Sequence, residues 1–216
     1  MPFETYSTPI PNCVIKAEGY PYTESIKIVE SIGDSWVTTP TFEKKHEKTK
    51  SNYDLGVTTP NSIKISFEEK LKTGAFCFLY YEDKLIAYTG LLITPDMKVA
   101  ISHRMLSNPV EYPKHTGLWT DTVLLWQIKT AIEKDCQEFW ISWDEHNFNQ
   151  YKIFENGGKL RRFNFRTNDF ILRKFDFTGK TELYNTMQYI AKLDLTKSDV
   201  LELINKQSFE KIVCIL

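Results

Sequence analysis

The sequence predicts an α/β or α+β domain, because segments with strand-like and helix-like patterns alternate along one chain. Aromatic and β-branched residues fill two short runs, 75–81 and 85–93, on either side of a turn-like segment, as in a β-hairpin. Apolar residues at helical spacing over 117–135 predict an amphipathic helix. With 216 residues and a hydrophobic share of 42%, the chain is long enough to bury one core. We therefore expect one domain built around one sheet.

Charge and composition argue against several classes of partner. The 27 basic and 28 acidic residues nearly cancel, so no global field attracts nucleic acid or an anionic membrane. The basic and aromatic residues at 159–166 fit the alternation of a half-exposed strand more simply than a nucleic-acid surface. The first 30 residues hold no long apolar run, and 75–81 is far too short to span a membrane. We expect a cytoplasmic protein with no nucleic-acid and no membrane partner.

The four cysteines lie far apart in the sequence and form no C-x-x-C pair. They are Cys13, Cys77, Cys136 and Cys214. This spacing argues against a zinc ribbon and against a redox-active dithiol. We expect reduced and mostly buried thiols, and we expect no metal site.

Residues 1–62 predict an irregular N-terminal extension that packs on or flanks the core. Six prolines punctuate it, and the segment 42–54 is charged and poor in apolar residues. Within the extension, 24–33 has the pattern of a short helix that ends at Gly33. A role of this arm in assembly is a further hypothesis.

From residue 63 the pattern tightens into a predicted core that ends at residue 178. The first expected elements are a helix at 63–73, closed by Gly74, and a hairpin of 75–81 and 85–93 with a three-residue turn at 82–84. A strand at 98–106, the helix at 117–135 and a strand at 138–143 follow. The core ends with a short helix at 149–156 and a second hairpin of 161–166 and 170–177. Residues 179–216 are expected to extend the same domain, with a helix within 196–207 and a final strand at 209–216. That last strand either extends the sheet or pairs across a homodimer.

One short motif in the core has a familiar spacing. Asn147 is followed by Gln150, by the aromatic Phe154 seven positions after the Asn, and by Gly158 four positions later. Together with the order of elements over 63–178, this motif resembles the GNAT superfamily of acyl-CoA-dependent N-acyltransferases. The resemblance covers about half of the chain. It implies a GNAT-like mixed, mostly antiparallel central sheet with helices on both faces.

A second, weaker match lies at the start of the central helix, where the superfamily holds the phosphates of its acyl-CoA. The matching residues are Lys114, His115, Thr116, Gly117, Leu118 and Trp119. Free N–H groups at a helix N-terminus point at an anion, and the helix dipole favours negative charge there. The bulky Trp119 departs from the family pattern. Two alternatives stay open, because its indole either folds into the core or blocks the phosphates.

The resemblance also implies that two parallel strands, 98–106 and 138–143, separate so that the pantetheine arm of acetyl-CoA can pair with exposed backbone. Backbone amides at Met105, Leu106 and Ser107 would then polarise the thioester carbonyl, as donors that face developing charge. Asn147 and Phe154 would line the same arm.

Acyl transfer to an amine needs a base for the amine and a proton for the departing thiolate. Asp144, Glu145, His146 and His103 are possible bases, and we select Glu145 and His103 as the candidates. The superfamily often uses a Tyr as the proton donor, but Phe154 stands at that position and has no hydroxyl. Tyr151 lies three positions earlier and is our candidate replacement, since residues at that spacing share a helix face. The alternatives are that water supplies the proton, and that these side chains serve packing alone.

The resemblance implies an acyl-CoA-dependent N-acyltransferase that moves an acetyl group from acetyl-CoA to a small-molecule or protein amine. Because fold analogy does not settle function, a catalytically inactive binding or scaffold protein of the same fold stays as the alternative. Phe154 and Trp119 are the residues that favour this alternative. The sequence does not identify the acceptor amine.

Overall fold

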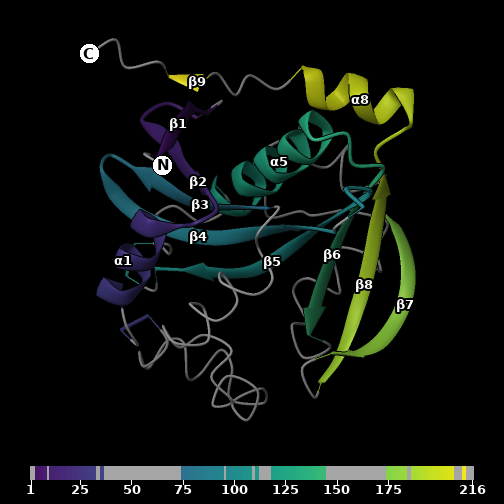
Figure 1. The fold of residues 1–216 in the computed structure, drawn as a ribbon, viewed down its shortest axis with the longest axis horizontal. Helices are drawn as coiled ribbons and strands as arrows, with labels where there is room; N and C mark the ends of the chain where they lie inside the picture. Colours follow the sequence, from purple (N-terminus) through teal and green to yellow (C-terminus); the bar gives the residue numbers. More distant parts are fainter. Residues whose placement is uncertain are drawn as a thin grey trace.

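The computed structural model describes the chain in ten segments: residues 3–8, 10–32, 35–36, 74–94, 96–108, 110–111, 118–144, 174–183, 186–206 and 211–212. Within them lie nine strands: β1 (Glu4–Ser7), β2 (Cys13–Gly19), β3 (Ala75–Tyr81), β4 (Lys84–Ile93), β5 (Val99–Ser107), β6 (Glu138–Asp144), β7 (Asp176–Leu183), β8 (Thr186–Asp194) and β9 (Lys211–Ile212). The helices of the described segments are α1 (Thr23–Ile32), α5 (Leu118–Glu133) and α8 (Ser198–Asn205). Figure 1 shows their arrangement around one sheet.

The strands form one sheet in the order β7-β8-β6-β5-β4-β3-β2-β1-β9. Neighbouring strands are antiparallel except β5 and β6, which are parallel. The expectation of a mixed, mostly antiparallel sheet is therefore confirmed.

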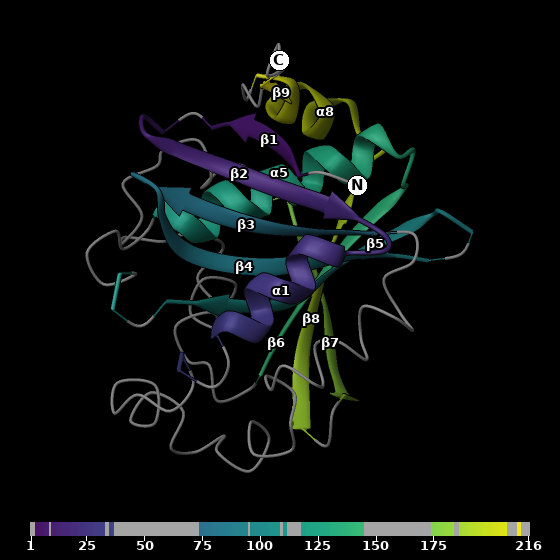
Figure 2. The ribbon, with the colours of Figure 1, turned by 60° about the vertical axis from the view of Figure 1, so that its left-hand side comes forward.

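The alternation of side chains along β3 explains why helices cover both faces of this part of the sheet. Cys77 and Leu79 point to a cluster that includes the inner face of α5. Phe76 and Phe78 belong to a second cluster with Tyr22 and the inner face of α1. Figure 2 shows α1 on one side of the sheet and α5 on the other, so helices cover both faces as expected.

The first hairpin lies where the sequence predicts it, but its turn is shorter. Tyr81 pairs with Lys84, so only Glu82 and Asp83 form the turn. Both have positive φ angles, 49° and 63°. Two-residue turns of this kind match the twist of antiparallel strands. The predicted three-residue turn is therefore wrong by one residue.

The N-terminal region differs most from the expectation. The stretch 4–32 is not irregular, because it holds β1, β2 and the predicted helix, α1. All seven residues of β2 pair with β3, which makes β2 an internal strand of the sheet. Residues 37–73, with the predicted helix at 63–73, lie outside the described residues.

At the C-terminal end, the helix expected within 196–207 is present as α8. The final strand is short, and β9 pairs with β1 of the same chain, so it extends the sheet. The second hairpin is made by β7 and β8. The proposed boundary at residue 178 thus falls inside β7, and the sequence analysis missed β8. The segments proposed as a helix at 149–156 and a strand at 161–166 lie outside the described residues.

Candidate functional site

The parallel pair β5–β6 is joined at one end only. Its register comprises Val99 with Glu138, Ala100 with Phe139, and Ile101 with Trp140. Beyond these three pairs, β5 continues along β4, and β6 continues along β8. Figure 1 shows the two strands running in different directions after the ladder. We call residues 102–107 of β5 and 141–144 of β6 the β5–β6 split.

The β5–β6 split leaves strand edges in the middle of a sheet. Within the described residues, no strand pairing joins 102–107 to 141–144. Backbone N–H and C=O groups that lack a strand partner need another hydrogen-bonding partner, such as water or a ligand. An extended chain with amide groups can bind to such an edge as an added strand would. The separation of the two strands that the resemblance implies is therefore present.

A β-bulge lies in β5 beside the split. Tyr88 pairs with Leu106 and Gly90 pairs with His103, so only Thr89 stands opposite the two residues 104 and 105. A bulge of this kind bends its strand and changes the direction of its peptide groups. It also interrupts the regular alternation of residues along the strand. The bulge thus lies in the segment where amide donors are expected.

Packing fixes the end of β5 after the bulge. The Leu106 side chain is buried in the cluster of Tyr88 and Trp36, whose rings stack at a centroid distance of 5.5 Å. Asn108 then closes the strand, because its N–H donates to the carbonyl of Ile86 at 2.7 Å and its Nδ2 donates to the carbonyl of Leu85 at 3.0 Å. The backbone at the split is therefore held from the side of β4.

The helix α5 begins at Leu118, directly after the segment that we expect to contact phosphate. Its apolar stripe packs as predicted, with Val123, Trp126 and Ile128 buried in the main cluster. Its N-terminal N–H groups would favour an anion. The direction of the Trp119 side chain lies outside what the structure describes, so both alternatives for it remain.

The predicted site residues fall into two groups. His103, Met105, Leu106 and Ser107 lie together in β5, and Leu118 and Trp119 lie in the first turn of α5. The others lie outside the described residues: Lys114, His115, Thr116, Gly117, Glu145, Asn147, Tyr151 and Phe154. The structure thus brings together the proposed amide donors, while the roles of the proposed base and acid remain predictions.

Two buried polar features were not predicted. Gln127 lies on the inner face of α5 and donates to the Thr89 hydroxyl and the Gly90 carbonyl. The Glu18 carboxylate accepts hydrogen bonds from the backbone and hydroxyl of Ser25 at the start of α1, so it caps that helix. A polar amide among the apolar residues of this helix was the available signal for Gln127.

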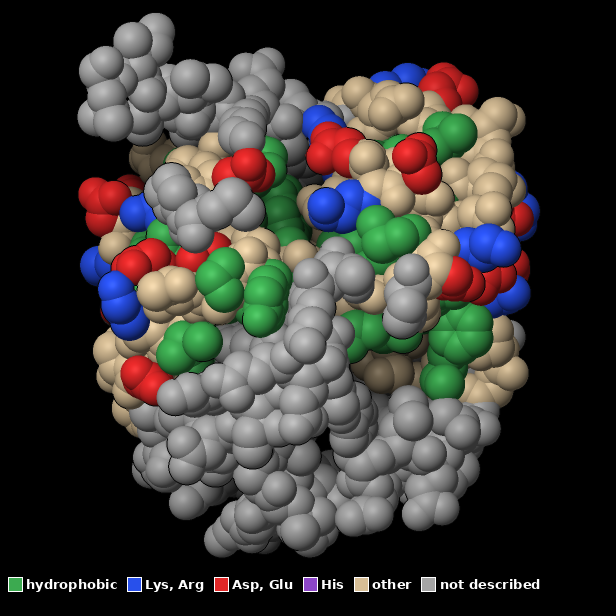
Figure 3. Space-filling model, in the orientation of Figure 1, with side chains coloured by type: hydrophobic (Ala, Val, Ile, Leu, Met, Phe, Trp, Pro, Cys, Tyr) green, Lys and Arg blue, Asp and Glu red, His purple; other side chains and the backbone are tan. Residues whose placement is uncertain are grey.

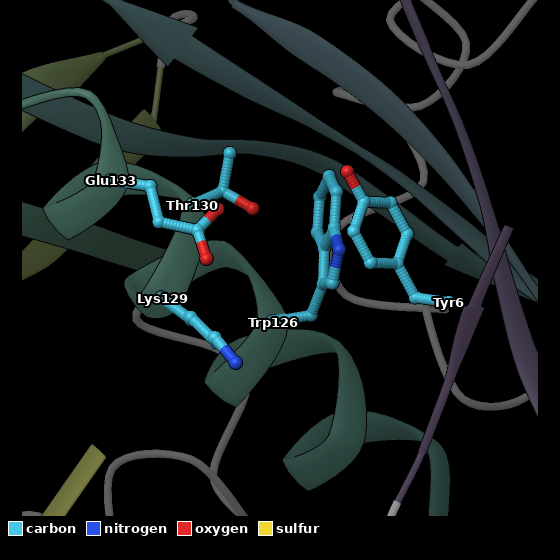
Figure 4. Close-up of a pocket in the computed structure, with 5 residues that line it drawn as sticks. All are labelled: Tyr6, Trp126, Lys129, Thr130 and Glu133. Atoms are coloured by element: carbon cyan, nitrogen blue, oxygen red, sulfur yellow. The ribbon is translucent and has the colours of Figure 1, made fainter. Parts of the chain in front are cut away.

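Other surfaces give weaker candidates. Figure 4 shows a pocket between β1 and α5, where the Tyr6 ring lies against Trp126 beside Lys129, Thr130 and Glu133. The space in it for a water-sized sphere is about 10 Å³, which suits about one water. Acidic and basic side chains are mixed on the face drawn in Figure 3, without a field of one sign.

The described part of the chain can be compared with the requirements of a metal cluster and of a membrane-spanning helix. It contains no cluster of three or more His, Cys, Asp or Glu side chains suited to a metal ion. None of the helices in these segments combines the length and apolar character needed to cross a membrane. Cys13, Cys77 and Cys136 are free and buried, and burial raises the pKa of the Cys13 thiol to about 11. Cys214 lies outside the described residues.

Comparisons with known proteins give a clear answer at the level of the fold. No known protein family and no curated protein sequence matches the chain. An uncharacterised protein from Bacillus halodurans aligns over 95% of both chains, with 12% identity and a TM-score of 0.60. The PaiA N-acetyltransferase of Thermoplasma acidophilum, solved with coenzyme A, aligns over 83% of this chain and 98% of its own, with 12% identity and a TM-score of 0.52.

A third structure, an aminoglycoside N(6′)-acetyltransferase from Legionella pneumophila, aligns over 88% of this chain and 95% of its own, with 12% identity and a TM-score of 0.52. At this identity the likeness concerns the fold alone. The chain has the fold of the GNAT N-acetyltransferases in a divergent form, which confirms the resemblance that the sequence suggests.

Proposed function

We propose that this chain is an acyl-CoA-dependent N-acyltransferase that moves an acetyl group from acetyl-CoA to an amine. The observation that carries the proposal is the β5–β6 split, where a parallel ladder stops after three pairs in the middle of the sheet. The coenzyme A bound to the PaiA enzyme of the same fold supports this choice of cosubstrate.

The proposed binding mode follows from the backbone. The pantetheine arm would pair with the free edge of β5, with Asn147 and Phe154 beside it. The N-terminus of α5 and the preceding residues from Lys114 would face the phosphates, where the helix dipole favours negative charge. Of the predicted donors in the bulged segment, the amides of Met105 and Ser107 would donate to the thioester oxygen as negative charge develops on it, because the pairing of Leu106 with Tyr88 directs the Leu106 N–H toward β4.

The proposed reaction forms one bond and breaks another. The amine nitrogen attacks the thioester carbon, the new C–N bond forms, and the C–S bond breaks to release a thiolate. Glu145 or His103 would take the proton that the amine loses, directly or through water. Tyr151 or water would protonate the thiolate, because Phe154 carries no hydroxyl.

The acceptor is proposed only as a class, a small-molecule or protein amine. One protein of the same fold is an aminoglycoside N(6′)-acetyltransferase. Another, with a TM-score of 0.50, is a spermidine N-acetyltransferase. These names support an amine acceptor without selecting one.

Isothermal titration calorimetry with acetyl-CoA and with CoA tests the cosubstrate. We expect both to bind with Kd values below 1 mM, which corresponds to about −4 kcal/mol. Lys114→Ala should weaken binding about threefold to tenfold, because it removes one charge near the phosphates. Lys129→Ala is the matched control, since it removes the same charge from the pocket side of α5. Absence of binding at millimolar ligand would refute the proposal.

The alternative, an inactive binding or scaffold protein, is favoured by Phe154 and Trp119. Release of CoA from acetyl-CoA in the presence of a panel of small amines and Lys-containing peptides separates the two. Amine-dependent release supports the enzyme. Tight CoA binding without release for any member of the panel supports the scaffold.

A further inference from the structure

Gln127 is an unusual residue for its position. It is fully buried on the face of α5 that packs on the sheet, next to apolar neighbours such as Trp126 and Ile128. Its Nε2 donates to the carbonyl oxygen of Gly90 at 2.9 Å and to the hydroxyl of Thr89 at 3.2 Å. One buried amide thus links the helix to two consecutive residues of β4.

Both acceptors lie at the bulge. Thr89 is the single residue that stands opposite 104 and 105, and Gly90 forms the last regular pair, with His103, before the register shifts. The Thr89 side chain is almost fully buried, so the contact is shielded from water. The helix side chain therefore contacts β4 at the point where β5 leaves the regular ladder.

Burial of this amide has a cost that packing alone does not explain. A buried polar group is destabilising unless hydrogen bonds replace those it made to water. Within the described part of the chain, the Oε1 atom of Gln127 is buried without a hydrogen-bond partner. An apolar side chain of similar volume would avoid that cost. The two bonds at the bulge are thus the specific contribution that Gln127 makes.

We propose that Gln127 is a positioning residue that holds β4 at Thr89 and Gly90. By holding β4 it fixes the β5 bulge, which aims the backbone amides of Met105 and Ser107 into the β5–β6 split. The proposal rests on the proposed function for its catalytic consequence. Its structural part, the control of the bulge by the helix, is independent of that function. Errors of about 1 Å in such a site reduce rates by about a hundredfold, so the position of these amides matters.

The position of Met105 can be observed directly. The chain has four methionines, Met1, Met97, Met105 and Met187, so selective labelling with [15N]methionine gives a simple amide spectrum. Met97 and Met187 lie outside the bulge and serve as internal references. Gln127→Leu removes the donor without adding a methionine. We expect the Met105 signal to move or broaden much more than the two reference signals.

Ile128→Val is the matched control, because it changes a buried side chain at the next position of the same helix. The Met105 signal should stay in place in this variant. Affinity for acetyl-CoA and kcat/KM for the best amine should each fall about tenfold to a hundredfold in Gln127→Leu. In Ile128→Val both should remain within a factor of two of the wild type, about 0.4 kcal/mol.

The outcomes separate the two claims. A Met105 signal that is unchanged in folded Gln127→Leu overturns the proposal, and so does a shifted signal with unchanged acetyl-CoA affinity and turnover. A shifted signal in a protein whose wild type does not bind acetyl-CoA leaves the role at the bulge intact and refutes the proposed function. If Gln127→Leu does not fold, Thr89→Val removes one acceptor with little change in volume. Its Met105 signal should move in the same direction, and an unmoved signal overturns the proposal.

Discussion

The two halves of the sheet differ in the clusters that their described residues form. In the N-terminal half, β2 to β5, apolar side chains fill one cluster against α5 and another against α1. In the C-terminal half, β6 to β8, Phe139, Ala191 and Leu193 are buried on the side of α5. The other face of these strands carries the partly exposed Glu138 and Lys192, joined by an ion pair.

The β5–β6 split lies at the boundary between these two halves. Within the described residues, three residue pairs join β5 to β6, and side chains of both halves pack in one cluster with α5.

The largest expected effect comes from Phe78, which is fully buried in the aromatic cluster with Phe76 and Tyr88. Phe78→Ala should lower the free energy of unfolding by about 3–5 kcal/mol, because it leaves a cavity in this aromatic cluster. Trp140→Ala, at a partly exposed position of β6, should cost about 1 kcal/mol. Urea denaturation measures both. Equal losses of unfolding free energy in the two variants would contradict the difference in packing between the two halves of the sheet.

A smaller effect is expected at the start of β3. A Cβ atom added at Gly74 would overlap the carbonyl oxygen of Leu91, so Gly74→Ala must displace backbone. We expect a loss of about 1–3 kcal/mol in the free energy of unfolding. Gly19→Ala is the matched control, because an added Cβ there meets nothing within 4 Å. Its thermal unfolding should lie close to that of the wild type, and a large loss there would count against the tight packing inferred for Gly74.

The packing of α1 against the sheet depends on Glu18, whose carboxylate accepts hydrogen bonds at the start of this helix. Its removal by Glu18→Ala leaves the first turn of α1 without its carboxylate cap, at a cost of about 1–2 kcal/mol. Hydrogen exchange should accelerate over α1, while β6 and β8 should keep their protection. Glu24→Ala removes an exposed ion pair with Lys27 and should change little. Uniform acceleration over the whole sheet would show that the two faces do not act separately.

Much of the fold could be predicted from the sequence, because long periodic segments dominate it. The strong stripe of α5 and the aromatic runs of β3 and β4 were located to within a few residues. β2 was missed although Cys13, Ile15 and Ala17 alternate at strand spacing. The segment is short, and Pro11 before it and the charged Glu18 near its end both argue against a strand. A segment this short fits a strand or a turn about equally well from its sequence. Its pairing with β3 makes it a strand.

The candidate site could be predicted only in part. The strands of the split were located correctly, since each is rich in apolar and aromatic residues. The bulge could not be predicted, because it depends on which residues of β4 and β5 face each other. Gln127 was visible as a polar interruption, but its partners, Thr89 and Gly90, lie 38 and 37 positions away in the sequence.

The smallest expected effect concerns the ion pair of Glu138 and Lys192 in the C-terminal half of the sheet. Lys192 and the Trp140 indole donate hydrogen bonds to the Glu138 carboxylate, and these bonds lower its pKa below the ordinary value of 4.5. A lowered pKa in the folded state means that the ionised carboxylate stabilises the fold above pH 4.5, and that this contribution is lost as the pH falls further. Glu138→Gln should therefore lower Tm at pH 7 by no more than about 2 °C, since the pair is partly exposed. The difference should shrink in 0.5 M salt and vanish in acid, where Glu138 is protonated. A larger loss at pH 7 that resists salt would mean that this ion pair is shielded from solvent.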